Sequence, residues 1–401
     1  MLTNIRIKNF KAIKDTSELK LNPLTCFIGY NGSGKSSVLE ALLTLKELTT
    51  DGLDSAMLRW KGFENVQFKG VERKKITHRN LADNDEVQVF DRPVSIRVKS
   101  KFTGTGKNGK KLYTAETEIT KLIENEQIVF LKEDFVMQNE KSFAYHRDFN
   151  GQIYYSDNSK AANTENSNIY KLANDKSLFS DLNLLHDIRS WQFMRMSPDE
   201  MGEPYPQKRT SGFIPLNMNG SNVAEYLLSI KNDSQTAYES IVNTMVRSVL
   251  PYASGLRSEL TSEVDRKIFL NLEEKNYNIP GWLLSTGTLR IVALLAMFRH
   301  PKPAPVVIIE ELENGLDPRS IHLIVSEIRR FTEETGSQVI FTSHSPYLLD
   351  LLKLDELVFV EKTVNEIKFI HPANNKDVVE WADKFTPGKL YTMSRLNPES
   401  K

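Results

Sequence analysis

The stretch that decides the fold is LTCFIGYNGSGKSSVLEALL, residues 24–43. It opens with an apolar run typical of a buried strand, passes through a glycine-rich turn, and continues with Val38 and Leu42 at helical spacing, a face that Leu45 and Leu48 extend. Residues 29–36 fit the phosphate-loop pattern, in which glycine and four further residues precede Gly-Lys-Ser. An ordinary glycine-rich turn before a helix is the alternative. The strand before the turn and the helix after it favour the phosphate loop.

This pattern indicates a particular chemistry. Glycines let the backbone N–H groups wrap a phosphate, and the start of a helix favours negative charge. Lys35 is expected to reach the terminal phosphates as a catalytic residue, and Ser36 to ligate Mg²⁺. The predicted nucleotide-contacting residues of the loop are Asn31, Gly32, Ser33, Gly34, Lys35, Ser36 and Ser37.

A second segment, VVIIEELENGLDP at 306–318, runs four apolar strand-type residues into several acids. A surface turn after a strand is often acidic, so the acids alone do not indicate a functional site. The phosphate loop elsewhere in the chain favours a functional interpretation of this segment. Carboxylates at the end of a parallel strand can handle a nucleotide-bound Mg²⁺ and the attacking water. We expect Glu310 to orient Mg²⁺, through water, and Glu311 to polarise the attacking water. Glu310 stands where Asp is usual, which leaves open weaker Mg²⁺ binding or slower turnover.

A third segment, LLSTGTLRIVALLA at 283–296, places Ser285 and Gly287 at the start of an apolar helix. A serine hydroxyl and backbone amides at a helix N-terminus make an anion site, although the same residues also suit an ordinary N-cap. Further on, His344 follows the apolar run of VIFTSHSPYLLD and could hydrogen-bond a terminal phosphate or the attacking water. A lone histidine after a strand is more often a structural turn residue, but here it follows the other motifs in order.

Together these segments resemble the head domain of the ABC ATPase superfamily in its non-transporter branch, which holds RecF, SMC-type heads and the OLD nucleases. They are most similar to the bacterial stand-alone AAA family ATPases of ABC type, as found in antiphage or abortive-infection systems. The residues that carry this resemblance are LSTGTLR, EELENGLDP, SHSPYLLD, NGSNVAEYL and VVEWADKFTPGKLY.

The resemblance implies a head-to-tail homodimer, or a higher even oligomer, that sandwiches ATP and Mg²⁺. Ser285 and Gly287 of one subunit would contact the γ-phosphate held by the other, and Asp317 would cross the interface. The family also uses a glutamine that senses the metal. Gln192 is our candidate for this Mg²⁺ contact and Gln67 the second choice.

Composition limits the remaining possibilities. In 401 residues, Lys plus Arg and Asp plus Glu are both 52, so overall charge gives no reason to expect a nucleic-acid or membrane partner. Cys26 is the only cysteine, which excludes an intrachain disulfide and favours a reducing compartment. The longest apolar run, IVALLAMF, is far shorter than a membrane span, so we expect a cytoplasmic protein with no membrane partner.

The expected fold class is α/β, a P-loop NTPase of ABC-ATPase head type with a largely parallel core sheet and N-terminal antiparallel strands. We expect the first part of the ATPase core with the phosphate loop at 1–85, an inserted antiparallel β element at 86–160, a helical lobe at 161–280, and the second part of the core plus a tail at 281–401.

For partners, the resemblance implies an effector protein such as a nuclease or Toprim-like protein, and we expect no nuclease in this chain because the residues after Leu352 are too few for a Toprim domain. DNA or RNA could bind through the basic stretches 69–79 and 99–111 by phosphate contacts, although such runs are usually solvated loops. The leading hypothesis is an ATP-hydrolysing dimeric switch. The alternatives are a RecF-like DNA-binding repair ATPase, a transporter subunit, and a nucleotide-locked scaffold with little turnover.

Overall fold

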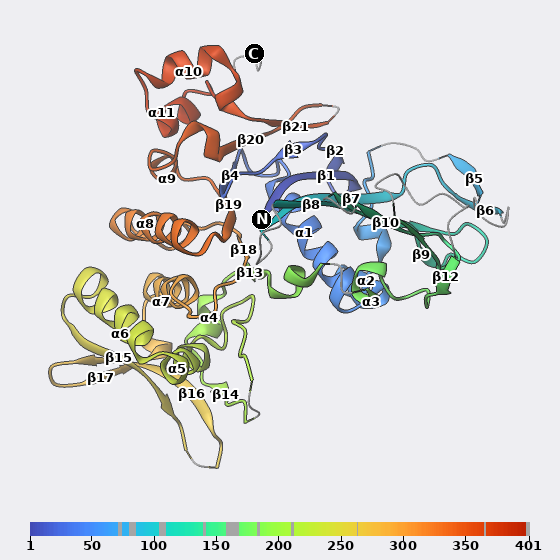
Figure 1. The fold of residues 1–401 in the computed structure, drawn as a ribbon. Coiled ribbons are helices and arrows are strands. Elements are labelled where there is room, and N and C mark those ends of the chain that lie inside the picture. Colours follow the sequence, from blue (N-terminus) through green and yellow to red (C-terminus); the bar gives the residue numbers. More distant parts are fainter. Residues whose placement is uncertain are drawn as a thin grey trace. The chain divides into compact units, whose positions relative to one another are not determined.

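A computed structural model describes residues 1–70, 74–79, 86–103, 110–138, 142–157, 168–182, 185–209, 212–262, 264–364 and 366–397 (Figure 1). The chain forms two compact units, each assembled from separate stretches of sequence. Unit 1 comprises Met1–Asn22, Ile28–Trp191 and Val358–His371, and unit 2 comprises Pro23–Phe27, Gln192–Leu357 and Pro372–Lys401.

Unit 1 is built on a nine-stranded antiparallel sheet. Its strand order is β12-β11-β10-β9-β8-β7-β1-β2, and β3 also pairs with β1. The strands are β1 (Leu2–Phe10), β2 (Ile13–Asp15), β3 (Leu19–Lys20), β7 (Val94–Thr103), β8 (Lys110–Lys121), β9 (Ile128–Gln138), β10 (Phe143–Arg147), β11 (Gln152–Ser156) and β12 (Asn168–Lys171). A separate two-stranded hairpin is formed by β5 (Lys75–Arg79) and β6 (Glu86–Phe90).

The strands expected after residue 86 are present and antiparallel, but they do not form a small sheet of their own. β7 pairs with β1, with Ile7 opposite Ile96 and Ile5 opposite Val98, so they extend the N-terminal sheet. The physical reason is that these four side chains are buried on one common face, which neither group of strands could cover alone. The pairing joins residues far apart in sequence and therefore leaves no local signal.

The glycine-rich turn leads into α1 (Lys35–Thr50), as predicted, and α1 contacts β1 and β7. The predicted apolar face is confirmed, because Val38, Leu42, Leu45 and Leu48 are all fully buried. Shorter helices α2 (Leu53–Arg59) and α3 (Leu178–Asp181) and the antiparallel pair β20 (Leu357–Lys362) and β21 (Ile367–Ile370) complete the main elements of unit 1.

Unit 2 contains a sheet with the strand order β13-β18-β19-β4. The strands are β13 (Gln192–Met194), β18 (Val306–Ile309), β19 (Gln338–Ser343) and β4 (Leu24–Ile28), and β13, β18 and β19 run parallel. Helix α7 (Thr286–Phe298) precedes β18 and helix α8 (Pro318–Thr335) follows it. This is the alternation of strands and helices that the sequence predicted, and every residue of β4, β18 and β19 is buried.

The region expected to be helical, 161–280, has the helices α5 (Val223–Asp233) and α6 (Gln235–Thr244), but it also contains a four-stranded antiparallel sheet. The strands are β14 (Tyr205–Pro206), β15 (Ala253–Leu260), β16 (Lys267–Glu274) and β17 (Asn278–Pro280). In β16, Ile268, Leu270 and Leu272 lie two residues apart and are buried, but Phe269 is apolar and Asn271 is also buried, so the period of two is weak in the sequence.

The C-terminal segment of unit 2 adds the short helices α9 (Pro346–Leu349), α10 (Lys376–Ala382) and α11 (Pro387–Thr392). Among the described residues, none of the helices combines the length and the apolar character that crossing a membrane would require.

Candidate functional site

In unit 1, the phosphate loop closes around its own lysine. The Nζ atom of Lys35 donates to the carbonyl oxygens of Gly29 and Tyr30 at 2.8 and 2.9 Å, and the side chain is buried. An ammonium group held inside a loop of backbone amides is the arrangement expected to receive a phosphate. Asn31 and Gly32 are exposed, Ser33 and Ser37 are buried, and Ser36 is half-buried.

Gly34 makes the turn into α1 possible. It has a φ of +101°, a conformation that side-chain-bearing residues rarely adopt, and it is the N-cap of the helix. A Cβ atom at Gly34 would also lie 2.4 Å from Cδ1 of Ile367 in β21. Both the backbone angle and this close approach therefore require glycine.

In unit 2, Glu310 follows the last residue of β18. Its backbone N–H donates to the carbonyl of Met194, and its carboxylate lies 3.2 Å from Nε of Arg195. Sequence reasoning missed Arg195. It follows β13 and therefore lies beside the residue that follows the parallel neighbour β18, a pairing that the sequence alone does not reveal.

Glu311, the predicted catalytic acid, has an unusual backbone. Its φ is +49°, which is uncommon for a residue with a side chain, and its backbone N–H donates to Oγ1 of Thr342 at 2.8 Å. The side chain is exposed, and one carboxylate oxygen is 3.4 Å from Nδ2 of Asn314. Strained backbone of this kind persists where surrounding contacts fix it, and it is found most often at functional sites.

His344 follows β19 directly, at the same edge of the sheet as Glu311 because β18 and β19 are parallel. The backbone N–H of His344 donates to Oε1 of Glu313 at 2.5 Å. Unit 2 therefore places three predicted residues at one sheet edge: the metal-orienting acid Glu310, the catalytic acid Glu311, and His344, which is expected to contact a terminal phosphate or the attacking water and is called the switch histidine below.

The start of α7 packs against the turn that follows β18. Ser285 caps α7, where its hydroxyl accepts from the Thr288 amide at 3.1 Å. A Cβ atom on Gly287 would lie 2.6 Å from the carbonyl oxygen of Gly315, so only glycine permits this approach of two backbones. The predicted anion site and the acidic turn thus form one continuous surface segment within unit 2.

Asp317 caps α8. Its carboxylate accepts from the backbone amides of Arg319 and Ser320 at 2.9 and 3.1 Å and from the Ser320 hydroxyl at 2.6 Å. The Ser320 hydroxyl, followed by these amides, lowers the pKa of Asp317. Ser285 and Asp317 are thus both N-caps within the single chain, and their roles across a dimer interface remain predictions.

The two glutamine candidates lie in different units. Gln192 begins β13 opposite Val307, and its amide donates to the carbonyl of Leu216 at 2.8 Å. Gln67 is buried in unit 1, where it bridges to Phe10 of β1. Which of them contacts a metal remains a prediction.

The oxygen donors present suit Mg²⁺, namely the Ser36 hydroxyl and the Glu310 carboxylate. Over the described residues, no group of three or more His, Cys, Asp or Glu side chains is placed to hold a metal ion. A Mg²⁺ ion that keeps water and is bound chiefly by nucleotide phosphates needs only one or two such protein ligands.

Comparison with known proteins is consistent with this chemistry. Residues 24–350 match a family described as an AAA domain and putative AbiEii toxin of a type IV TA system. The chain is 20% identical to an ATP/GTP phosphatase of Helicobacter pylori over 381 residues, which cover 92% of this chain and 90% of that protein. It is also 26% identical over 135 residues to the methionine import ATP-binding protein MetN of Chlamydia caviae, and this match covers 33% of the chain and only 38% of MetN.

Among solved structures, the chain is similar to an SMC head bound to the C-winged helix domain of ScpA. The TM-score is 0.53 at 13% identity, over 92% of this chain and 97% of the other. This likeness shows that the fold is that of an SMC head, in agreement with the fold class predicted from the sequence.

Proposed function

Because the chain belongs to the family described as an AAA domain and putative AbiEii toxin of a type IV TA system, we propose that it is a Mg²⁺-dependent, nucleotide-sandwich dimer that switches a partner effector. The chain is an ATPase with an ABC-type head fold. The metal, the dimer and the effector are the proposed additions.

The observation that carries the proposal is the backbone of Glu311. The Thr342 hydroxyl holds its amide at the carboxyl end of β18, which fixes an exposed carboxylate beside Glu310 and at the same sheet edge as His344. A carboxylate in this place can accept a proton from a water that attacks a phosphate.

The other residues then take distinct roles. Lys35 would exchange its two carbonyl contacts for the terminal phosphates, while the amides of residues 32–36 bind phosphate oxygens. Ser36 and Glu310 would hold Mg²⁺, which when bound neutralises charge that develops on the phosphates. His344 would hydrogen-bond the γ-phosphate or the water.

We propose that Ser285 and Gly287 receive the γ-phosphate bound to a second copy. In support, Ser285 and Thr286 at the N-terminus of α7 are exposed, and Gly287 packs on Gly315 in the turn that leads to Asp317. Mass measurement with ATP, with ADP and without nucleotide tests the dimer. We expect ATP-dependent dimers that Ser285→Arg prevents, and dimers insensitive to this change would refute the trans contact.

Phosphate release from the purified chain tests the catalytic assignment. We expect Glu311→Gln to lower the rate by roughly 10²–10⁴-fold while ATP still binds, since a positioned general base contributes about that much. Glu334→Gln, on the exposed end of α8, is the matched control. Equal rates for Glu311→Gln and wild type would show that Glu311 is not the base. A wild type that binds ATP without turnover would instead favour the nucleotide-locked scaffold.

For the effector, we propose a nuclease or Toprim-like partner in an antiphage system, in line with the family described as a putative toxin. Copurification from the native host in ATP and in ADP tests this role. Recovery of one partner in a single nucleotide state is the expected result, and absence of any nucleotide-dependent partner would contradict it.

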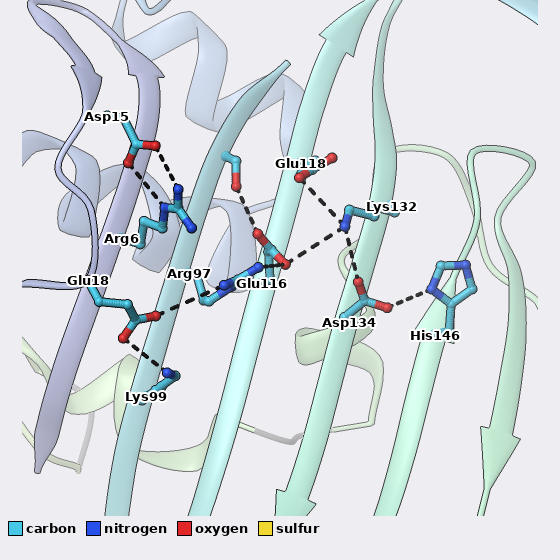
Figure 2. A network of polar contacts seen from close by, with 11 residues as sticks. Arg6, Asp15, Glu18, Arg97, Lys99, Glu116, Glu118, Lys132, Asp134 and His146 are labelled. Atoms are coloured by element: carbon cyan, nitrogen blue, oxygen red, sulfur yellow. Dashed lines mark hydrogen bonds and ion pairs between the residues drawn. The ribbon is translucent and has the colours of Figure 1, made fainter. Parts of the chain in front are cut away.

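A RecF-like DNA-binding role is the second candidate, and the charges described in unit 1 weigh against it. Figure 2 shows a row of ion pairs across the sheet in which Lys99 pairs with Glu18 at 3.0 Å and Arg97 with Glu116 at 2.8 Å. Arg79 likewise pairs with Glu86. Arg79 and Lys99, which belong to the two basic stretches, are matched in this way and offer little net attraction to phosphates, whereas Lys74, Lys75 and Lys101 of the same stretches are exposed. Parts of both basic stretches, residues 71–73 and 104–109, lie outside the described residues.

A further inference from the structure

One acid of the segment after β18 has no part in the chemistry described above. Glu313 accepts the backbone N–H of His344 on Oε1 at 2.5 Å. Its other oxygen, Oε2, is shielded from solvent and has no hydrogen-bond partner among the described residues. A buried acceptor without a hydrogen-bond partner costs free energy. Glu313 bears this cost on Oε2 while Oε1 accepts one backbone amide, so its contact with His344 is a specific arrangement.

This contact belongs to a set that joins two segments. The Glu311 amide donates to the Thr342 hydroxyl, the Leu312 amide donates to the Thr342 carbonyl at 3.2 Å, and the His344 amide donates to Glu313. The turn after β18 is therefore fastened to the end of β19 at three successive places. The first two contacts fix the backbone of the catalytic acid, and the third fixes the backbone of the switch histidine.

A buried cation balances the charge of this turn. Arg290, in the first half of α7, donates to the carbonyl of Met196 at 3.2 Å and is attracted electrostatically by both Glu311 and Glu313. Its Cδ atom would lie 3.6 Å from a Cβ atom placed on Gly315. The guanidinium therefore lies under the acidic turn, where its positive charge offsets the cost of half-burying the Glu313 carboxyl group.

We propose that Glu313 is a positioning residue for ATP hydrolysis, which holds the backbone of His344 so that its imidazole and the Glu311 carboxylate are presented at the same sheet edge. This inference rests on the proposed function. Glu313 touches neither phosphate nor water in this scheme and acts only through His344. A purely structural role, in which Glu313 stabilises the turn without affecting the histidine, is the competing interpretation.

Amide hydrogen exchange tests the positioning without any need for turnover. Glu313→Ala removes the acceptor, so a peptide that contains His344 should exchange roughly tenfold faster or more, while peptides of α8 stay unchanged. Glu313→Gln keeps a carbonyl acceptor and should retain much of the protection. Glu334→Ala, which removes an exposed acid of the same unit, is the control. Unchanged exchange at His344 in Glu313→Ala would overturn the proposal.

A double-mutant cycle on phosphate release tests the link to the reaction. We expect Glu313→Ala to lower kcat by about 10–100-fold with less than about a threefold change in the KM for ATP, because misplacement of a reacting group costs this much. Glu313→Gln, which keeps a carbonyl acceptor, should lower kcat by a smaller factor. In a His344→Ala background, adding Glu313→Ala should change kcat by no more than about twofold, since the two residues act as one. Independent, multiplicative losses would show the purely structural role.

The two measurements separate the possible failures. If the wild type releases no phosphate but Glu313→Ala still speeds exchange at His344, the proposed function fails and the backbone contact stands. If turnover is normal, Glu311→Gln abolishes it, and Glu313→Ala changes neither kcat nor exchange, the proposed function stands and the role of Glu313 is refuted.

Discussion

The turn into α1 allows a prediction whose two energy terms can be separated. Gly34→Ala would place a side chain at a φ of +101°, which costs on the order of 1–3 kcal/mol. It would also set Cβ at 2.4 Å from Cδ1 of Ile367, against an ordinary carbon contact of about 3.5–4.0 Å, and relieving such overpacking costs typically about 1–3 kcal/mol. The remaining Ile367 atoms lie at 3.7 Å or more.

Ile367→Val deletes the one atom that collides. By itself this change should lower the free energy of unfolding by about 0.5–1.5 kcal/mol, because Ile367 is buried. The losses in free energy of unfolding should not add: the double variant should be more stable than the sum of the single losses predicts, by about 1 kcal/mol or more. The backbone strain at residue 34 should remain in the double variant, so its free energy of unfolding should stay below that of the wild type.

The assay is the dissociation constant for ADP, together with the thermal midpoint, for wild type, both single variants and the double variant. ADP avoids turnover during the measurement. For a domain of about 150–250 residues, 1 kcal/mol corresponds to ~2–4 °C in the midpoint. Strictly additive losses would refute the collision with Ile367, and a Gly34→Ala variant with wild-type affinity and midpoint would refute both terms.

Two further predictions concern the helix that follows the acidic turn. Asp317→Ala should lower the free energy of unfolding at pH 7 by about 1 kcal/mol through loss of the α8 N-cap. Because the pKa of Asp317 is lowered in the folded chain, the difference from wild type in thermal midpoint should hold above pH ~4 and narrow as the pH falls through the folded pKa. Asp317→Asn keeps a capping oxygen, so it should restore most of this stability, and a loss as large as that of Asp317→Ala would contradict the cap. Glu327→Gln should lower the free energy of unfolding by roughly 3 kcal/mol, because it leaves Arg299 and Arg330 without the carboxylate that they contact at 2.5 and 2.6 Å. The control is Glu333→Gln on the exposed face of α8, which should change the thermal midpoint little. A Glu327→Gln midpoint equal to that of the control would show that this buried pair contributes nothing.

The sequence was most informative where a local pattern alone determines the structure. The strand β4, the turn at Gly34 and the face of α1 follow from a short motif and from helical periodicity, and each is present in the structure. Pairings between distant segments could not be read in this way. β1 pairs with β7 because both strands bury side chains on the same face of the sheet. The residues near either strand in the sequence do not indicate which strand is its partner.

The same distinction holds at the candidate site. The positions of Glu310 and His344 at strand ends follow from the order of strands and helices along the chain. The contacts that orient them come from elsewhere, namely Arg195 after β13, Thr342 at the end of β19 and Arg290 from α7. These partners are visible only once β13 is known to lie beside β18 and α7 beneath the turn. Residue type and spacing therefore suggested the acids, and three-dimensional neighbours determine what each can do.

The concentration of negative charge after β18 is explained by the different partners of its four carboxylates. Glu310 lies against Arg195, Glu313 holds the amide of His344, and Asp317 accepts the amides that open α8. Glu311 differs, because its strained backbone is fixed while its exposed carboxylate has a weak 3.4 Å contact with Asn314 and a through-space attraction to Arg290. A group that is fixed in position but weakly engaged keeps its lone pairs for an incoming water, whereas each of the other three carboxylates already has a close cation or amide partner. On physical grounds, Glu311 is therefore the acid of this turn best placed to act on a nucleophile.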